Sequence, residues 1–191
     1  MSFINGIRHF KTITSHRMLV MRYCFRAGLY MQGLTHDLSK YSPTEFLVGA
    51  KYYKGTYSPN NAERKDLGVS TSWLHHKGRN RHHYEYWIDY PTDPSKGYGL
   101  TGTKMPRRFV AEMVFDRVAA SRTYNGASYK DSDPLNYFLK SKKLTWYIHP
   151  TTKKELEFLL RMWAVKGEDF TIAYIKKVFL IKKKRHRLFF K

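Results

Sequence analysis

Residues 106–124 read PRRFVAEMVFDRVAASRTY, the most strongly periodic stretch of the chain. Phe109, Met113 and Ala120 recur at helical spacing after the opening proline, which predicts a long α-helix. Asp116 falls on the same apolar stripe. Because a buried carboxylate without a partner is costly, we expect Asp116 to be paired with a cation or to bind a metal.

Helical signals continue on both sides of this stretch, and alternating strand patterns are scarce. The segment SPTE at residues 42–45 has the form of a capping box, which marks the start of a helix. A loop rich in Gly and Pro is predicted over residues 90–104. The predicted helices cover residues 15–31, 43–54, 60–77 and 106–124, a further helix begins at Asp133-Pro134, and a pair hinged near Gly167 begins at Pro150. The sequence therefore predicts an all-α helical bundle.

The composition is that of a packed and strongly basic protein. The chain has 191 residues, and 42% of them are apolar, which argues against general disorder. Lys and Arg number 35 against 15 Asp and Glu, giving a net charge of +20 that favours phosphate esters, nucleic acid or another anionic partner. Cys24 is the only cysteine, which excludes an intrachain disulfide and a cysteine-based zinc finger. With no long apolar run and no signal peptide, we expect no transmembrane segment and a cytoplasmic protein.

The end of the chain carries a concentration of positive charge. Residues 176–191 read KKVFLIKKKRHRLFFK and hold 8 of the 35 basic residues with no acidic one. One interpretation is a solvated extension after the last helix. The other is a contact with nucleic acid or an acidic membrane surface, because apolar groups alternate with the charges. The sequence leaves both open.

Potential metal ligands are concentrated in the first half of the chain, which holds seven of the nine histidines: His9, His16, His36, His75, His76, His82 and His83. Neutral imidazole is the commonest ligand of transition metals in proteins. Helical spacing puts His16 on an apolar face with Val20 and Tyr23. The same spacing aligns Asp37 with Tyr30 and Leu34, and aligns His76 with Val69 and Trp73.

Each of these positions also has a simpler interpretation. A histidine on an apolar face is more often a hydrogen-bonded core residue than a ligand. Asp116 pairs with Arg22 or Arg26 in this interpretation, and Asp37 bonds to a neighbouring backbone group. Four potential ligands on apolar faces together favour a metal site.

At this point the pattern resembles a known family. The segment GLTHDLSK (residues 33–40) is similar to the His-Asp signature of the HD-domain metal-dependent phosphohydrolases, and His16 stands where such proteins carry their first histidine. The pairs His75-His76 and His82-His83 resemble the extra histidines of its two-metal, HD-GYP-like branch. The segment FDRVAASRTY (residues 115–124) is similar to the last motif of the family.

The resemblance covers about residues 9–125. It implies a division into an HD-like metal-binding helical domain (residues 1–130), C-terminal helices packed on it (residues 131–175) and the basic tail (residues 176–191). The chain as a whole also resembles an uncharacterised family of small bacterial and phage proteins, through HDLSKYSPTEF (residues 36–46) and WLHHKGRN (residues 73–80).

The resemblance implies one or two divalent ions of Mn, Fe or Zn. The first ion is expected on His16, His36, Asp37 and Asp116. Asp37 bridges to a second ion that is held by His76 with one or both of His82 and His83. His75 is a further candidate metal ligand. One member of each histidine pair is expected either to support a ligand or to act as a general acid. Adjacent residues of a regular helix point about 100° apart, so both cannot face one ion.

The implied activity is hydrolysis of a phosphoester, in a nucleotide or a related phosphorylated substrate, by a metal-activated water. Asp37, Lys40 and His83 are the candidate catalytic residues. The candidate substrate contacts are basic: Lys40, Arg79, Arg81 and Arg122. The alternative is a basic nucleic-acid-binding or nucleotide-sensing protein with a structural or degenerate metal site.

Overall fold

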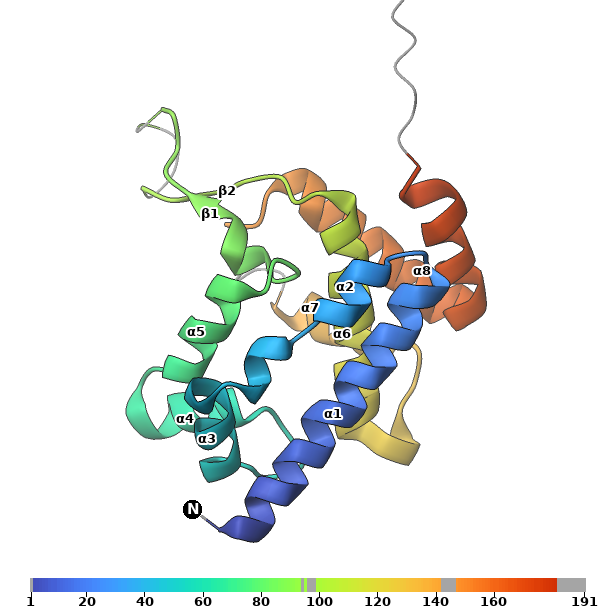
Figure 1. Cartoon of the computed structure of the whole chain (residues 1–191). Coiled ribbons are helices and arrows are strands. Elements are labelled where there is room, and N and C mark those ends of the chain that lie inside the picture. Colours follow the sequence, from blue (N-terminus) through green and yellow to red (C-terminus); the bar gives the residue numbers. More distant parts are fainter. Residues whose placement is uncertain (1, 94, 96–98, 142–146, 182–191) are drawn as a thin grey trace, which may run out of the picture.

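The computed structural model describes residues 2–93, 95, 99–141 and 147–181, which fold mostly into helices (Figure 1). The α-helices are α1 (Phe3–Arg26), α2 (Tyr30–Thr35), α3 (Pro43–Lys51), α4 (Pro59–Leu67), α5 (Thr71–Arg79), α6 (Arg107–Asn125), α7 (Asp133–Ser141) and α8 (Pro150–Tyr174). Three short 3₁₀ segments (Leu38–Tyr41, Tyr84–Trp87 and Gly126–Ser128) and one π-helical segment (Ile175–Phe179) connect or extend them. The all-α prediction is confirmed.

The predicted loop over residues 90–104 is bounded by a small hairpin. Strands β1 (Ile88–Asp89) and β2 (Thr101–Gly102) pair antiparallel, with Ile88 opposite Gly102. A ladder of two residues contributes little to the core, so the helices determine the architecture.

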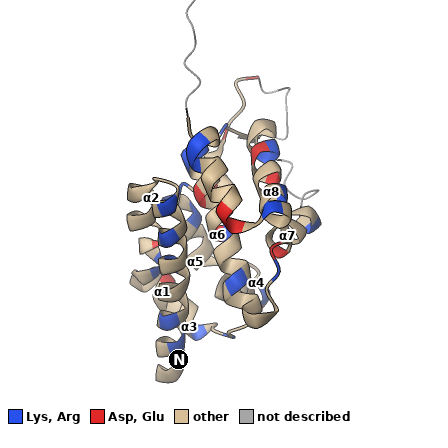
Figure 2. Ribbon diagram, turned by 90° about the vertical axis from the view of Figure 1, so that its right-hand side faces the viewer, with Lys and Arg blue, Asp and Glu red and all other residues tan. Residues whose placement is uncertain are grey.

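Helix α6 lies at the centre of the core, between α1 and α8 (Figures 1 and 2). The prediction of this helix from its periodicity is confirmed to within one residue at each end. Its side chains are buried without interruption from Val110 to Phe115, because neighbours cover it on more than one side. Glu112 lies within this buried run and is therefore in the interior together with the apolar residues.

Helix α1 presents one buried face to the rest of the bundle. His9, Ile13, His16, Val20 and Tyr23 follow one another at intervals of three or four residues and are all buried. The predicted inward position of His16 is therefore confirmed. The helix predicted over residues 15–31 is two helices: α1 begins much earlier and ends near Gly28, where a φ of 79° halts it before α2 starts.

The single helix predicted over residues 60–77 is also divided. Gly68 adopts a left-handed conformation with φ 74° and ends α4. Ser70 then caps α5, its hydroxyl accepting a hydrogen bond from the Trp73 backbone N–H. Val69 lies in this break and is 45% exposed, so the predicted helical line from Val69 to His76 was wrong. His76 is buried because of where α5 packs, against α3.

The C-terminal helix bends where the sequence predicts a hinge, because Gly167 interrupts α8 with φ 75°. The chain continues into the π-helical segment, in which Ile175 and Phe179 are buried in the core. The first part of the predicted basic tail thus belongs to the packed helical body, and residues 182–191 lie outside the described residues. Among the described residues, no helix combines the length and the apolar character that crossing a membrane requires.

Candidate metal centre

The potential ligands come from four separate parts of the bundle. Helix α1 supplies His16, and the turn between α2 and the first 3₁₀ segment supplies His36 and Asp37. Helix α5 and the turn after it supply His76, His82 and His83, and α6 supplies Glu112 and Asp116. Within the described residues they form three groups, in each of which the potential ligand atoms lie within 4.8 Å of one another: the two clusters described next, and a smaller group of His36, His82 and Glu112.

The first cluster consists of His16, His36, Asp37 and Asp116. His16 Nε2 lies 3.1 Å from Asp116 Oδ1 and 3.6 Å from Asp37 Oδ2. His36 Nε2 lies 3.4 Å from Asp37 Oδ2 and 3.7 Å from Asp116 Oδ1. Two imidazoles and two carboxylates thus face one point, the same set that the resemblance implied for a first ion.

The second cluster consists of Asp37, His76, His82 and His83. Asp37 Oδ1 lies 3.4 Å from His76 Nε2 and 3.4 Å from His82 Nε2. His83 Nε2 lies 2.9 Å from His76 Nε2. Asp37 therefore belongs to both clusters and turns one carboxylate oxygen toward each.

Asp37 holds this place through an unusual backbone conformation. Its φ of 54° and ψ of 22° are left-handed, and it is the one non-glycine residue with positive φ in the described part of the chain. The predicted alignment with Tyr30 and Leu34 was wrong, because α2 ends before Asp37 and both of those side chains are about half exposed. Asp37 itself is 1% exposed. The turn, and not a helical face, buries it.

Several converging atoms make no hydrogen bond of good geometry within the described structure: His36 Nε2, His82 Nε2 and Asp37 Oδ1. A buried polar atom without a partner costs stability, and such atoms are rare in folded proteins. Here they lie in one place and are all of the types that bind transition metals. The residues present therefore fit one or two divalent ions.

Charge around Asp37 favours its ionised form. Burial alone raises the pKa of this carboxyl, but His36 and Lys40 hold it well below its usual value. Lys40 Nζ forms an ion pair with Asp37 Oδ2 at 2.6 Å. Burial likewise raises the pKa of Asp116, and its hydrogen bond with His16 lowers it well below the ordinary range. Both carboxylates are thus ionised at neutral pH, as metal ligands must be.

Two buried glutamates support the histidines, and sequence reasoning missed both. Glu112 Oε1 lies 2.8 Å from His36 Nδ1 and 3.2 Å from His82 Nδ1. Glu45 Oε2 lies 2.8 Å from His76 Nδ1. Carboxylates that hold the second nitrogen of a ligand histidine are a regular feature of metal sites. The one available signal for Glu112 is its place one helical turn before Asp116.

The helix start predicted at residues 42–45 is confirmed, because α3 begins at Pro43, but the capping box itself does not form. Ser42 makes no side-chain cap to α3, and its hydroxyl has no hydrogen-bond partner in the described structure. The carboxylate of Glu45 instead contacts two histidines, because His75 Nδ1 lies 2.6 Å from Glu45 Oε1. His75 is outside both clusters, so the structure does not bring it together with the other predicted ligands.

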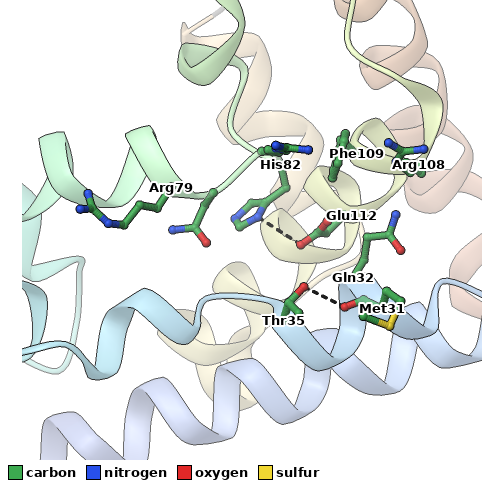
Figure 3. A pocket seen from close by; sticks show the side chains of 10 residues that line it. Met31, Gln32, Thr35, Arg79, His82, Arg108, Phe109 and Glu112 are labelled. Carbon is green, nitrogen blue, oxygen red and sulfur yellow. Dashed lines mark hydrogen bonds and ion pairs between the residues drawn. The ribbon is translucent and has the colours of Figure 1, made fainter.

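Two pockets reach the centre from different directions. The larger, of about 710 Å³, is lined by His83 and Asp116 and also by Arg64, Trp73, Arg117 and Lys140. The smaller, of about 520 Å³, is lined by His82 and Glu112 and is bordered by Arg79, Arg81 and Arg108 (Figure 3). Arg79 and Arg81, predicted substrate contacts, thus border the smaller pocket and not the one that reaches Asp116.

The remaining predicted substrate contact lies elsewhere. Arg122 pairs with Glu168 at 3.1 Å and lies over the ring of Tyr129. Arg26, the alternative partner for Asp116, pairs with Glu168 and Asp169 instead. Sequence reasoning missed Arg117, which follows Asp116 directly. Arg117 lines the larger pocket, and its buried Nε has no hydrogen-bond partner within the described residues.

One comparison with known proteins finds a match. Residues 6–162 match the model of a family of unknown function (DUF5662). The chain belongs to this family. The DUF5662 match begins in α1 and ends within α8, so it includes every residue of both clusters together with Glu45 and Glu112. Neither a curated protein nor a solved structure matches the chain.

Proposed function

We propose that this chain is an HD-type metal-dependent phosphohydrolase, acting in the cytoplasm on a nucleotide or a related phosphorylated substrate. The observation that carries the proposal is the carboxylate of Asp37, buried between two sets of ligands with one oxygen turned toward each. A carboxylate shared in this way is typical of a two-metal site. The ions, when bound, lower the pKa of a water molecule and neutralise charge on the phosphoryl group.

The ligand types indicate which ions the centre binds. The first cluster offers two imidazoles and two carboxylates, and the second offers three imidazoles and one carboxylate. Imidazole suits Fe and Zn, and carboxylates suit Mn, whereas Ca²⁺ and Mg²⁺ favour sites made entirely of oxygen atoms. We therefore expect a transition metal at both positions.

The larger pocket is the natural place for the substrate, because it reaches both clusters through His83 and Asp116. Arg117 lines this pocket, and a guanidinium group can bind a phosphate through two N–H donors at once. Trp73 and Tyr124 add aromatic surface to the lining, which favours a base or another flat group. Lys40, paired with Asp37, keeps positive charge beside the shared carboxylate.

Metal content tests the proposal. Untagged protein is analysed for metals beside a His36→Ala/Asp37→Ala variant and a His75→Ala control, which alters a histidine outside both clusters. We expect bound transition metal in the wild type and the control and loss of it in the double variant. The loaded protein is then screened against phosphomonoesters and phosphodiesters.

Two results would overturn the proposal. One is protein without metal even after incubation with manganese, iron or zinc. The other is a loaded protein that hydrolyses no phosphoester in the screen. Salt-dependent binding to DNA or RNA by such a protein would support the nucleic-acid alternative. The basic residues that bear on this alternative are not confined to one element: Figure 2 shows Lys and Arg on several helices, α1, α4 and α8 among them.

A further inference from the structure

Glu112 contacts two histidines with a single oxygen atom. Its Oε1 lies 2.8 Å from His36 Nδ1 and 3.2 Å from His82 Nδ1, and the residue is 4% exposed. An ionised carboxylate can only accept hydrogen bonds, so both Nδ1 atoms must carry the proton. In a neutral ring the lone pair is then on Nε2. Burial raises the pKa of Glu112, but its bonds to the two histidines bring it below the usual value.

The two histidines belong to different clusters. His36 turns its Nε2 toward Asp37 Oδ2 in the first cluster, and His82 turns its Nε2 toward Asp37 Oδ1 in the second. Their ring centroids lie only 4.4 Å apart. Asp37 thus faces the Nε2 side of both rings, and Glu112 faces the Nδ1 side of both.

We propose that Glu112 is a shared positioning residue, which fixes the tautomer and orientation of one ligand histidine in each ion site. The proposal rests on the two-ion centre of the proposed function. Loss of this one carboxylate releases His36 and His82 together, so it weakens both ion sites at once. Loss of a carboxylate that holds a ligand of one site weakens only that site.

Glu112 acts through the histidines and not on the substrate. Its side chain lines the smaller pocket, where Figure 3 shows it directed at His82. The larger pocket, which contains His83 and Asp116, does not include it. A substitution of Glu112 therefore leaves the expected substrate contacts in place.

Glu45 provides a matched control within the same protein. It is also a buried glutamate that contacts two imidazole Nδ1 atoms, those of His76 at 2.8 Å and His75 at 2.6 Å. Only His76 belongs to a cluster. Glu45→Gln and Glu112→Gln thus remove the same charge from similar surroundings, but they affect one ion site and two, respectively.

The experiment is a titration of metal-free full-length protein with Co²⁺, followed by calorimetry and by visible absorption. We expect two equivalents in the wild type. Glu112→Gln should weaken both by about 10- to 100-fold, the usual cost of removing such a support. Glu45→Gln should weaken one equivalent and leave the other unchanged. Circular dichroism confirms that each variant is folded.

A second measurement does not depend on affinity. Imidazole ¹⁵N shifts of the Zn²⁺-loaded protein report the tautomer of each histidine. In the wild type, His36 and His82 should carry the proton on Nδ1. Glu112→Gln should disturb both signals and leave His76 unaffected, whereas a general loss of packing would disturb all three. If Glu112→Gln fails to fold, Glu112→Asp, which keeps the charge on a shorter side chain, replaces it in both measurements.

The inference and the proposed function can fail separately. Unchanged Co²⁺ binding in Glu112→Gln, or weakening of only one equivalent, overturns the shared role of Glu112 while the hydrolase proposal stands. Suppose that the wild type binds two ions, that Glu112→Gln weakens both, and that the protein cleaves no phosphoester. The role of Glu112 then stands, and the hydrolase proposal is overturned. A wild type that binds no ion overturns both.

Discussion

Replacement of Gly49 by alanine should destabilise the protein by a predictable amount. Gly49 lies in α3 against α1, and a Cβ added there would lie 2.1 Å from His9 Nε2. Ordinary contacts begin at 3.4 Å, so the two groups must separate by about 1.3 Å. His9 cannot simply rotate away, because it is buried beside Phe46 and Tyr53.

Two opposing energies decide the size of the effect. Overpacking of this kind costs about 1–3 kcal/mol. Alanine gains about 0.5–1 kcal/mol over glycine in a helix. The difference is centred on a net loss of about 1 kcal/mol, which for a chain of this length lowers the melting temperature by about 2–4 °C.

The assay is urea unfolding followed by circular dichroism, in a double-mutant cycle with His9→Ala. Once the imidazole is gone, only the helix preference remains, so Gly49→Ala should stabilise the His9→Ala protein. An equal loss in both backgrounds would refute the steric argument. In the wild-type background, displacement of α3 also moves Glu45, which lies one helical turn from Gly49, so ion binding at the second cluster should weaken.

Further predictions concern ions, pH, the bend in α8 and the substrate. Chelation should lower the melting temperature in calorimetry, because an ion present at 100 times its Kd stabilises the fold by about 2.7 kcal/mol; an unchanged value would contradict ion binding. Burial, and secondly the charge of Lys40, lower the pKa of His9 from 6.5 to about 4. Between these two values the unfolded chain binds more protons than the folded one, so the unfolding free energy of metal-free protein should decrease as the pH falls from 6.5 to about 4. His9→Gln should make this decrease in urea unfolding shallower, and an identical slope would contradict the assignment. Gly167→Ala should cost about 1–2 kcal/mol in thermal unfolding, because alanine strains the positive φ at the bend; no loss would mean that α8 straightens. Arg117→Ala should raise the KM for a phosphoester about tenfold or more, as expected for a lost charged hydrogen bond, whereas Arg122→Ala should leave KM unchanged. The opposite pattern in steady-state kinetics would move the phosphate contact to Arg122.

Much of the helical architecture could be predicted because its signals are local. Prolines mark the beginnings of α3, α4 and α8, and periodicity marks α6. The division at Gly68 was missed, because a glycine inside an apolar pattern is often tolerated within a helix. Whether the chain stays helical at Gly68 depends on how α4 and α5 pack, and that packing cannot be predicted from this segment alone.

The residues of the two clusters were predictable for a different reason. Histidines and aspartates in recognisable motifs identify themselves by type, which indicated the side chains that converge in both clusters; His75 was included wrongly, and the argument for burying Asp37 was wrong. The supporting glutamates carry no such mark. Glu45 and Glu112 are ordinary helix residues in sequence, and the imidazoles that contact their buried carboxylates come from distant segments. The burial of these two glutamates therefore depends on the tertiary structure and cannot be predicted from local sequence.

The left-handed backbone at Asp37 limits which sequences can occupy this position as relatives diverge. Asparagine and glycine adopt that conformation readily, but neither offers a carboxylate to share between two ions. Most other residues, glutamate included, strain the turn. Relatives that have lost the shared carboxylate are therefore expected to carry asparagine or glycine here while keeping the helical fold. Under the proposed function, the identity of this one residue should separate sequences that can hold two ions from those that cannot.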